Sequence, residues 1–239
     1  IKSFLSDDVE LIKKLYSSQG YNFANIETKI RKIDDDNLDL VIDIDRGEQT
    51  KISTISFIGD KIFSSYRLRQ IIASQEDKFW KIISQNTNFS ENLIDLDRRL
   101  LLNYYKSNGY YDVKINSNTE KLNQKGNVDL VYSINAGTRY IIKKISTNVD
   151  NVIDKELFFP MNEVFNKYVG DYYSPFKIKL ILDELDQLID QNNLQFVEHT
   201  VEEIIETDSI NIVFNIYEGE KDLIERINIT GNTVTNEDV

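Results

Sequence analysis

The sequence predicts an α+β protein in which one small unit of two helices and three strands is repeated in tandem. Three observations support this prediction. An alternating apolar run occurs three times, a short apolar segment follows each run after a glycine, and a long amphipathic helix with the same end signals precedes two of the runs. Such spaced repeats indicate a modular architecture.

Apolar residues alternate with mainly polar ones in three segments, and each segment ends three residues before a glycine. A period of two is that of a strand with one buried face. An isoleucine eight residues after each glycine, at Ile55, Ile145 and Ile227, predicts a further strand behind a glycine-containing turn. The alternating residues are Leu38, Leu40, Ile42 and Ile44; Val128, Leu130, Tyr132 and Ile134; and Ile210, Ile212, Phe214 and Ile216.

Long helices are predicted from Ser90 to Gly109 and from Ser174 to Asn193. Serine is a favoured residue before a helix, and glycine or asparagine tolerates the positive φ that often follows one. Shorter helices are expected in 65–72 and 154–165. The apolar stripes that we assign to the long helices are Leu93, Leu96, Leu100 and Tyr104, and Ile178, Ile181, Leu182, Leu185 and Ile189.

The predicted order of elements in each unit is strand, helix, helix, strand, strand. Residues 51–139 and 140–222 then hold one complete unit each, residues 1–50 hold the end of a unit, and residues 223–239 hold the start of another. Neighbouring repeats bury each other's apolar faces. We therefore expect the two incomplete units to expose apolar side chains unless they dock on something.

Three short motifs resemble the POTRA domains of an outer-membrane β-barrel assembly factor. They are "ISFIGD" (Ile55 to Asp60), "INITGN" (Ile227 to Asn232) and "YYKSNGYYDVKI" (Tyr104 to Ile115). The resemblance implies tandem POTRA domains, each β-α-α-β-β with a three-stranded mixed sheet covered on one face by two helices. The four segments would be parts of the second to fifth domains of the array. Val149 stands where the pattern has glycine.

The resemblance also implies partners and a location. In POTRA domains the second strand lies at a sheet edge, and here it corresponds to Tyr111 to Glu120. An edge strand offers unpaired N–H and C=O groups to an extended chain. Unfolded outer-membrane proteins or accessory lipoproteins of the assembly complex would bind there, in the periplasm. The residues implied are Asp112, Val113, Lys114, Ile115, Asn116 and Ser117.

The side chains of this strand should alternate, with Val113 and Ile115 on one face and Lys114 and Asn116 on the other. Two alternatives stay open. The edge could simply be one that the charge of Lys114 protects from unwanted strand pairing. The array could also belong to a two-partner secretion or translocation-and-assembly transporter, although those relatives usually carry fewer units.

Composition argues against several other classes. A net charge of -12 repels nucleic acid and anionic lipid, and the absence of cysteine excludes disulfides and thiolate metal sites. No apolar run approaches the roughly 18 residues needed for a membrane-spanning helix. We expect no cofactor and no bound metal.

Enzymatic motifs are weak. His199 is the single histidine and has no nucleophile in a recognisable pattern, so a strand or loop histidine is favoured over a general base. The run Asp34 to Asp39 lacks the glycine and terminal glutamate of a calcium loop and is interpreted as a polar hairpin turn. Asp183, Asp186 and Asp190 have helical spacing typical of a solvated face. The sequence therefore predicts a scaffold and not an enzyme.

Overall fold

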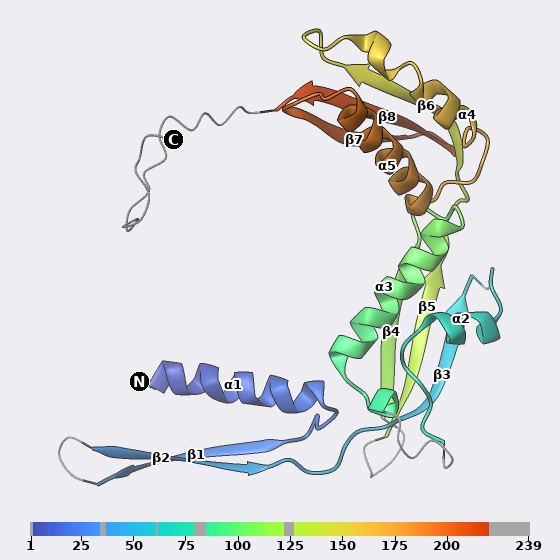
Figure 1. The fold of residues 1–239 in the computed structure, drawn as a ribbon. Coiled ribbons are helices and arrows are strands. Elements are labelled where there is room, and N and C mark those ends of the chain that lie inside the picture. Colours follow the sequence, from blue (N-terminus) through green and yellow to red (C-terminus); the bar gives the residue numbers. More distant parts are fainter. Residues whose placement is uncertain (1, 34–36, 61, 79–84, 122–126, 220–239) are drawn as a thin grey trace, which may run out of the picture. The chain divides into compact units, whose positions relative to one another are not determined.

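The computed structural model of the chain describes residues 2–33, 37–60, 62–78, 85–121 and 127–219 (Figure 1). The chain divides into two compact parts, which we call unit 1 and unit 2. Unit 1 consists of Ile1–Ile141 together with Tyr172–Phe176, and unit 2 consists of Ile142–Asp171 together with Lys177–Val239.

Unit 1 begins with a helix and a two-stranded antiparallel sheet, followed by a three-stranded sheet with its helices. The first group is α1 (Lys2–Ser18), β1 (Asn25–Lys32) and β2 (Leu38–Asp45). The second group is β3 (Ile52–Gly59), α2 (Ser65–Ile71), the short 3₁₀ helix η1 (Gln85–Thr87), α3 (Glu91–Ser107), β4 (Lys114–Lys121) and β5 (Val128–Asn135).

The three-stranded sheet of unit 1 has the order β3-β5-β4. Strand β3 runs parallel to β5 and β4 runs antiparallel to it, so the sheet is mixed, as predicted. Helices α2 and α3 supply the other side of a single apolar core. The core residues are Ile52, Ile55, Phe57, Leu68, Ile72, Ile94, Leu101, Tyr105, Val113, Ile115, Val128, Leu130, Tyr132, Ile134 and Ala136.

Helix α3 has the predicted ends. The Ser90 side chain accepts a hydrogen bond from the Leu93 N–H, which satisfies one of the free donors of the first turn. Gly109 follows the helix with a φ of +96°, a conformation that other residues adopt at a cost. The chain therefore leaves α3 in the direction that leads into β4.

The predicted apolar stripe of α3 is wrong by one residue. The buried positions are Ile94, Asp97, Leu101 and Tyr105, whereas Leu96 is 38% exposed. Leu93, Leu100 and Tyr104 are half-buried.

Unit 2 repeats the order of elements of the second group in unit 1. It contains β6 (Ile141–Val149, whose first residue belongs to unit 1), η2 (Lys155–Phe158), α4 (Met161–Asn166), α5 (Pro175–Gln191, whose first two residues belong to unit 1), β7 (Val197–Ile205) and β8 (Ser209–Glu218). Its sheet has the order β6-β8-β7. The predicted stripe of α5 is confirmed at Ile178, Ile181, Leu185 and Ile189, which are buried, while Leu182 is half-buried. Asn193 has the expected positive φ, at 50°.

The strands predicted at Ile55 and Ile145 are confirmed as β3 and β6, but the glycine-containing segments before them do not close hairpins. Strand β2 pairs with β1, and β3 pairs with β5 of the next sheet. Likewise β5 and β6 lie in different sheets. The glycine segments are connections from one sheet to the next, and the predicted strand at Ile227 lies outside the described residues.

Strand β2 exposes apolar side chains, as expected for residues 1–50. All eight of its residues are exposed, including Leu38 at 59% and Leu40 at 50%. Helix α1 contacts β1, so only part of this small sheet is covered. The other predicted incomplete unit, 223–239, lies outside the described residues.

Candidate functional site

Strand β4 lies at an edge of the unit 1 sheet. Within the described part of the chain it pairs with β5 alone, from Lys114 opposite Asn135 to Lys121 opposite Val128. The backbone groups of β4 that point away from β5 therefore face outward from the sheet. Such an edge can accept another extended chain.

The strand starts later than the sequence predicted. Of the six candidate residues, Lys114, Ile115, Asn116 and Ser117 lie in β4, whereas Asp112 and Val113 precede it. The chain is still turning there, because the Val113 N–H donates to the Tyr110 carbonyl at 3.4 Å. Binding of a partner by these six residues stays a prediction.

Asp112 has a structural role at this turn. It accepts a hydrogen bond from the Tyr140 hydroxyl, with the two oxygens 2.5 Å apart. This hydrogen bond, together with burial and the Asp112 charge, raises the pKa of Tyr140. Asp112 therefore holds the start of β4 against the segment that follows β5.

Side chains alternate across β4 in the predicted way. Val113 and Ile115 are 6% and 3% exposed and pack in the core, whereas Lys114 and Asn116 are exposed. Because the core-facing residues anchor the strand, its free backbone edge is held in a fixed position.

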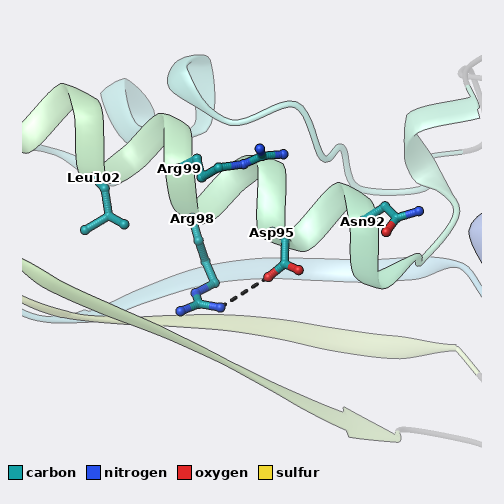
Figure 2. Close-up of a pocket in the computed structure, with 5 residues that line it drawn as sticks. All are labelled: Asn92, Asp95, Arg98, Arg99 and Leu102. Carbon is teal, nitrogen blue, oxygen red and sulfur yellow. Dashed lines mark hydrogen bonds and ion pairs between the residues drawn. The ribbon is translucent and has the colours of Figure 1, made fainter.

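A groove runs along α3 beside β4, and we call it the α3–β4 groove. One part, of about 460 Å³, is lined by residues of a single face of α3, which Figure 2 shows: Asn92, Asp95, Arg98, Arg99 and Leu102. The adjoining part, of about 510 Å³, is lined by Arg99, Leu102, Asn103, Lys106, Tyr111, Asp112, Val113 and Lys114. The two parts share Arg99 and Leu102, so they lie next to each other along α3.

Arg98 contacts the edge directly, which the sequence did not indicate. Its Nε donates to the Ile115 carbonyl at 3.3 Å, and its Nη1 lies 3.2 Å from Asp95 Oδ1 (Figure 2). The three-residue spacing of Asp95 and Arg98 on a helix favours their ion pair. The contact with Ile115 depends on the packing of α3 against β4, which no local pattern reveals.

The Arg98 contact shows which residues of β4 face outward. In an antiparallel ladder, alternate residues direct both N–H and C=O toward the partner strand. Since the Ile115 carbonyl meets Arg98 and not β5, Ile115 and Ser117 present their N–H and C=O groups at the free edge.

The equivalent edge strand in unit 2 is acidic. Strand β7 borders β8 at the end of the order β6-β8-β7 and exposes Glu198 and Glu202. His199, half-buried in β7, has its Nε2 2.7 Å from Asp186 Oδ1 of α5. The single histidine therefore lies in a strand, one of the two predicted settings, and links that strand to α5.

The described residues contain neither a metal-binding cluster nor a helix that could span a membrane. Across the described residues there is no group of three or more histidine, cysteine, aspartate or glutamate side chains that could hold a metal ion. Over the same residues, none of the helices has the length and apolar character that a bilayer crossing requires.

Residues 50–137 match the family model POTRA, described as a surface antigen variable number repeat. The chain is 25% identical over 239 residues to the outer membrane protein assembly factor BamA of Neisseria meningitidis serogroup B, covering 98% of the chain and 30% of that protein. It is 26% identical over 240 residues to BamA of Buchnera aphidicola, covering 95% of the chain and 37% of that protein. The chain thus spans about a third of the length of these relatives.

Solved structures show the same fold. The crystal structure of Haemophilus influenzae BamA POTRA3-5 superposes with a TM-score of 0.54 at 18% identity, covering 90% of this chain and 80% of that one. The chain therefore has the fold of tandem POTRA domains. Almost the whole length of the chain is similar to outer membrane protein assembly factors of the BamA type.

Proposed function

We propose that this chain holds unfolded β-barrel precursors and accessory lipoproteins during outer-membrane protein assembly, and that it does so without catalysis. The observation that supports this most directly is the free edge of β4, anchored by buried side chains and bordered by the α3–β4 groove. A barrel precursor is a series of extended segments with unpaired backbone groups, which is the chemistry that an edge strand pairs with.

We also propose that the functional divisions of the chain are 1–50, 51–139, 140–222 and 223–239. Each of the two middle segments contains one full set of two helical regions and three strands. The edges β4 and β7 would then be repeated features of an array, with different charges available to different partners.

The proposal is tested by blocking one backbone donor. Ser117→Pro removes an N–H that faces the free edge and leaves the ladder with β5 intact, because proline is tolerated on the outer side of edge strands. We expect binding of a synthetic peptide with the sequence of a barrel strand to fall about tenfold, because one edge hydrogen bond is lost and the proline ring hinders the approach of the added strand. Fluorescence anisotropy of the labelled peptide measures this.

Ser117→Ala is the matched control, because it shortens the same side chain and keeps the N–H. Far-ultraviolet circular dichroism of both variants should equal that of the unchanged protein. Peptide affinity that is the same for Ser117→Pro and Ser117→Ala would rule out pairing along this edge of β4.

A further inference from the structure

The α3–β4 groove is positively charged in a negatively charged protein. The whole chain has 28 basic and 40 acidic residues. The groove reverses this ratio, with four basic side chains and two acidic ones among its lining residues. The basic residues are Arg98, Arg99, Lys106 and Lys114.

Both acidic residues of the groove are already engaged. Asp95 pairs with Arg98, and Asp112 accepts from the Tyr140 hydroxyl. Arg98 is also engaged, through Asp95 and the Ile115 carbonyl. The positive charge that remains available to a ligand therefore comes from the other three basic residues.

Those three residues lie where an added strand would pass. Arg99 and Lys114 are exposed, and within the described residues neither has an ion-pair partner. Lys106 is half-buried with its Nζ 5.3 Å from the centre of the Tyr111 ring, which holds the ammonium at the wall of the groove. A strand paired with β4 would direct alternate side chains toward α3, and so toward Arg99 and Lys106.

We infer that the α3–β4 groove selects extended segments that carry acidic side chains at the positions facing α3. This inference rests on the proposed function, since it concerns which strands the edge of β4 accepts. Backbone pairing provides affinity without regard to sequence, and charge complementarity then adds the preference. The acidic edge of β7, with Glu198 and Glu202, shows that the basic groove is not a general property of the repeat.

Three peptides of about the length of β4 test the inference. They share an alternating barrel-strand sequence and differ only at two alternate positions, which carry aspartate, asparagine or lysine. At low ionic strength we expect the aspartate peptide to bind the whole chain about three- to tenfold more tightly than the asparagine peptide, and the lysine peptide to bind correspondingly more weakly. The preference should shrink at about 0.15 M salt, where exposed charges are screened.

Variants identify the residue responsible. Arg99→Glu should abolish or reverse the preference for aspartate. Lys13→Glu, on the exposed side of α1, makes the same change in net charge and should leave the preference unchanged. Circular dichroism of each variant shows that the fold is kept.

The outcomes separate the inference from the proposed function. If all three peptides bind equally and Arg99→Glu has no effect, charge selection is overturned while strand pairing stands. If Lys13→Glu reduces the preference as much as Arg99→Glu, net charge and not the groove is responsible, and the inference is again overturned. If none of the peptides binds, the inference fails together with strand pairing at β4.

Discussion

The cores of the two three-stranded sheets differ in the contact between the long helix and the central strand. In unit 1, helix α3 and the central strand β5 meet through Asp97 and Tyr132, both fully buried, and the tyrosine hydroxyl donates to the carboxylate at 2.6 Å. In unit 2, the same places in α5 and β8 hold Ile181 and Phe214, also fully buried. The fold is therefore compatible with either a polar or an apolar contact at this point.

The local backbone explains why unit 1 needs a carboxylate. Helix α2 ends at Ile71, and the N–H groups of Ala73 and Ser74 donate to Asp97 Oδ1 at 2.6 and 3.1 Å. In unit 2 the N–H groups after α4 find acceptors in the backbone of α4 itself, since the Lys167 N–H donates to the Val164 carbonyl at 3.2 Å. The buried carboxylate thus satisfies two donors that the end of α2 leaves without a helical partner.

The largest effect is expected from Asp97→Ala. The substitution leaves two backbone N–H groups and the Tyr132 hydroxyl without their acceptor in the core, and each buried donor without a partner costs free energy. We expect the free energy of unfolding of unit 1 to fall by about 3 kcal/mol. Urea unfolding followed by hydrogen exchange of peptides from each unit measures the change.

Asp95→Ala is the control for this prediction, because it removes an exposed carboxylate from the same helix. It should change the unfolding free energy by less than about 0.5 kcal/mol. Equal losses for Asp95→Ala and Asp97→Ala would show that the buried carboxylate does not support α2. Hydrogen exchange in unit 2 should be the same in both variants.

A smaller loss is expected from Tyr132→Phe, which gives β5 the aromatic residue that β8 carries. The ring keeps its stacking on Phe57, whose centroid lies 5.7 Å away. Asp97 keeps its two backbone donors, so one hydrogen bond to a charged group is lost and the expected cost is about 1 to 2 kcal/mol. The same unfolding measurement tests this, with Tyr66→Phe, at an exposed tyrosine, as the control.

Asp97 also explains where the sequence was informative and where it was not. Alternating runs gave β2, β5 and β8 directly, because one face of each strand is mainly apolar in sequence. The stripe of α3 was misplaced because a buried aspartate interrupts the true apolar face, and a neighbouring row of leucines matched helical spacing better. In α5, where Ile181 occupies the equivalent position, the pattern identified all four buried residues.

Two other features depended on contacts that the sequence does not encode locally. Gly59 has a φ of +89°, and a Cβ there would lie 2.1 Å from the Ile134 carbonyl oxygen. Val149 takes the equivalent place in unit 2, yet the following Asp150 N–H still reaches the Ile216 carbonyl at 2.9 Å, as that of Asp60 reaches Ile134. The edge position of β4 was anticipated from a family resemblance, but the basic groove beside it required the packed structure.

Apart from the control substitutions, the smallest expected change, and the only gain, is that of Tyr105→Phe. Tyr105 is fully buried where unit 2 has the apolar Ile189, and its hydroxyl has no hydrogen-bond partner among the described residues. Burying such a hydroxyl costs free energy that phenylalanine avoids. We expect unit 1 to become more stable by about 1 kcal/mol at neutral pH.

Alkaline pH gives this last prediction a second test. Burial, followed by the effects of Tyr110, Asp60 and Tyr104, raises the pKa of Tyr105 to about 12 from 10.0. The folded state therefore resists ionisation of Tyr105. The part of the stability that depends on its neutral hydroxyl is fully present below pH 10 and is lost as the pH rises from 10 toward 12. Tyr105→Phe should lose less stability over that range than the unchanged protein does. The prediction is wrong if Tyr105→Phe is less stable than the unchanged protein at pH 7 and equally sensitive to alkali. That result would mean that the Tyr105 hydroxyl is hydrogen-bonded in solution, so that this position differs less from Ile189 of unit 2 in the cost of burial.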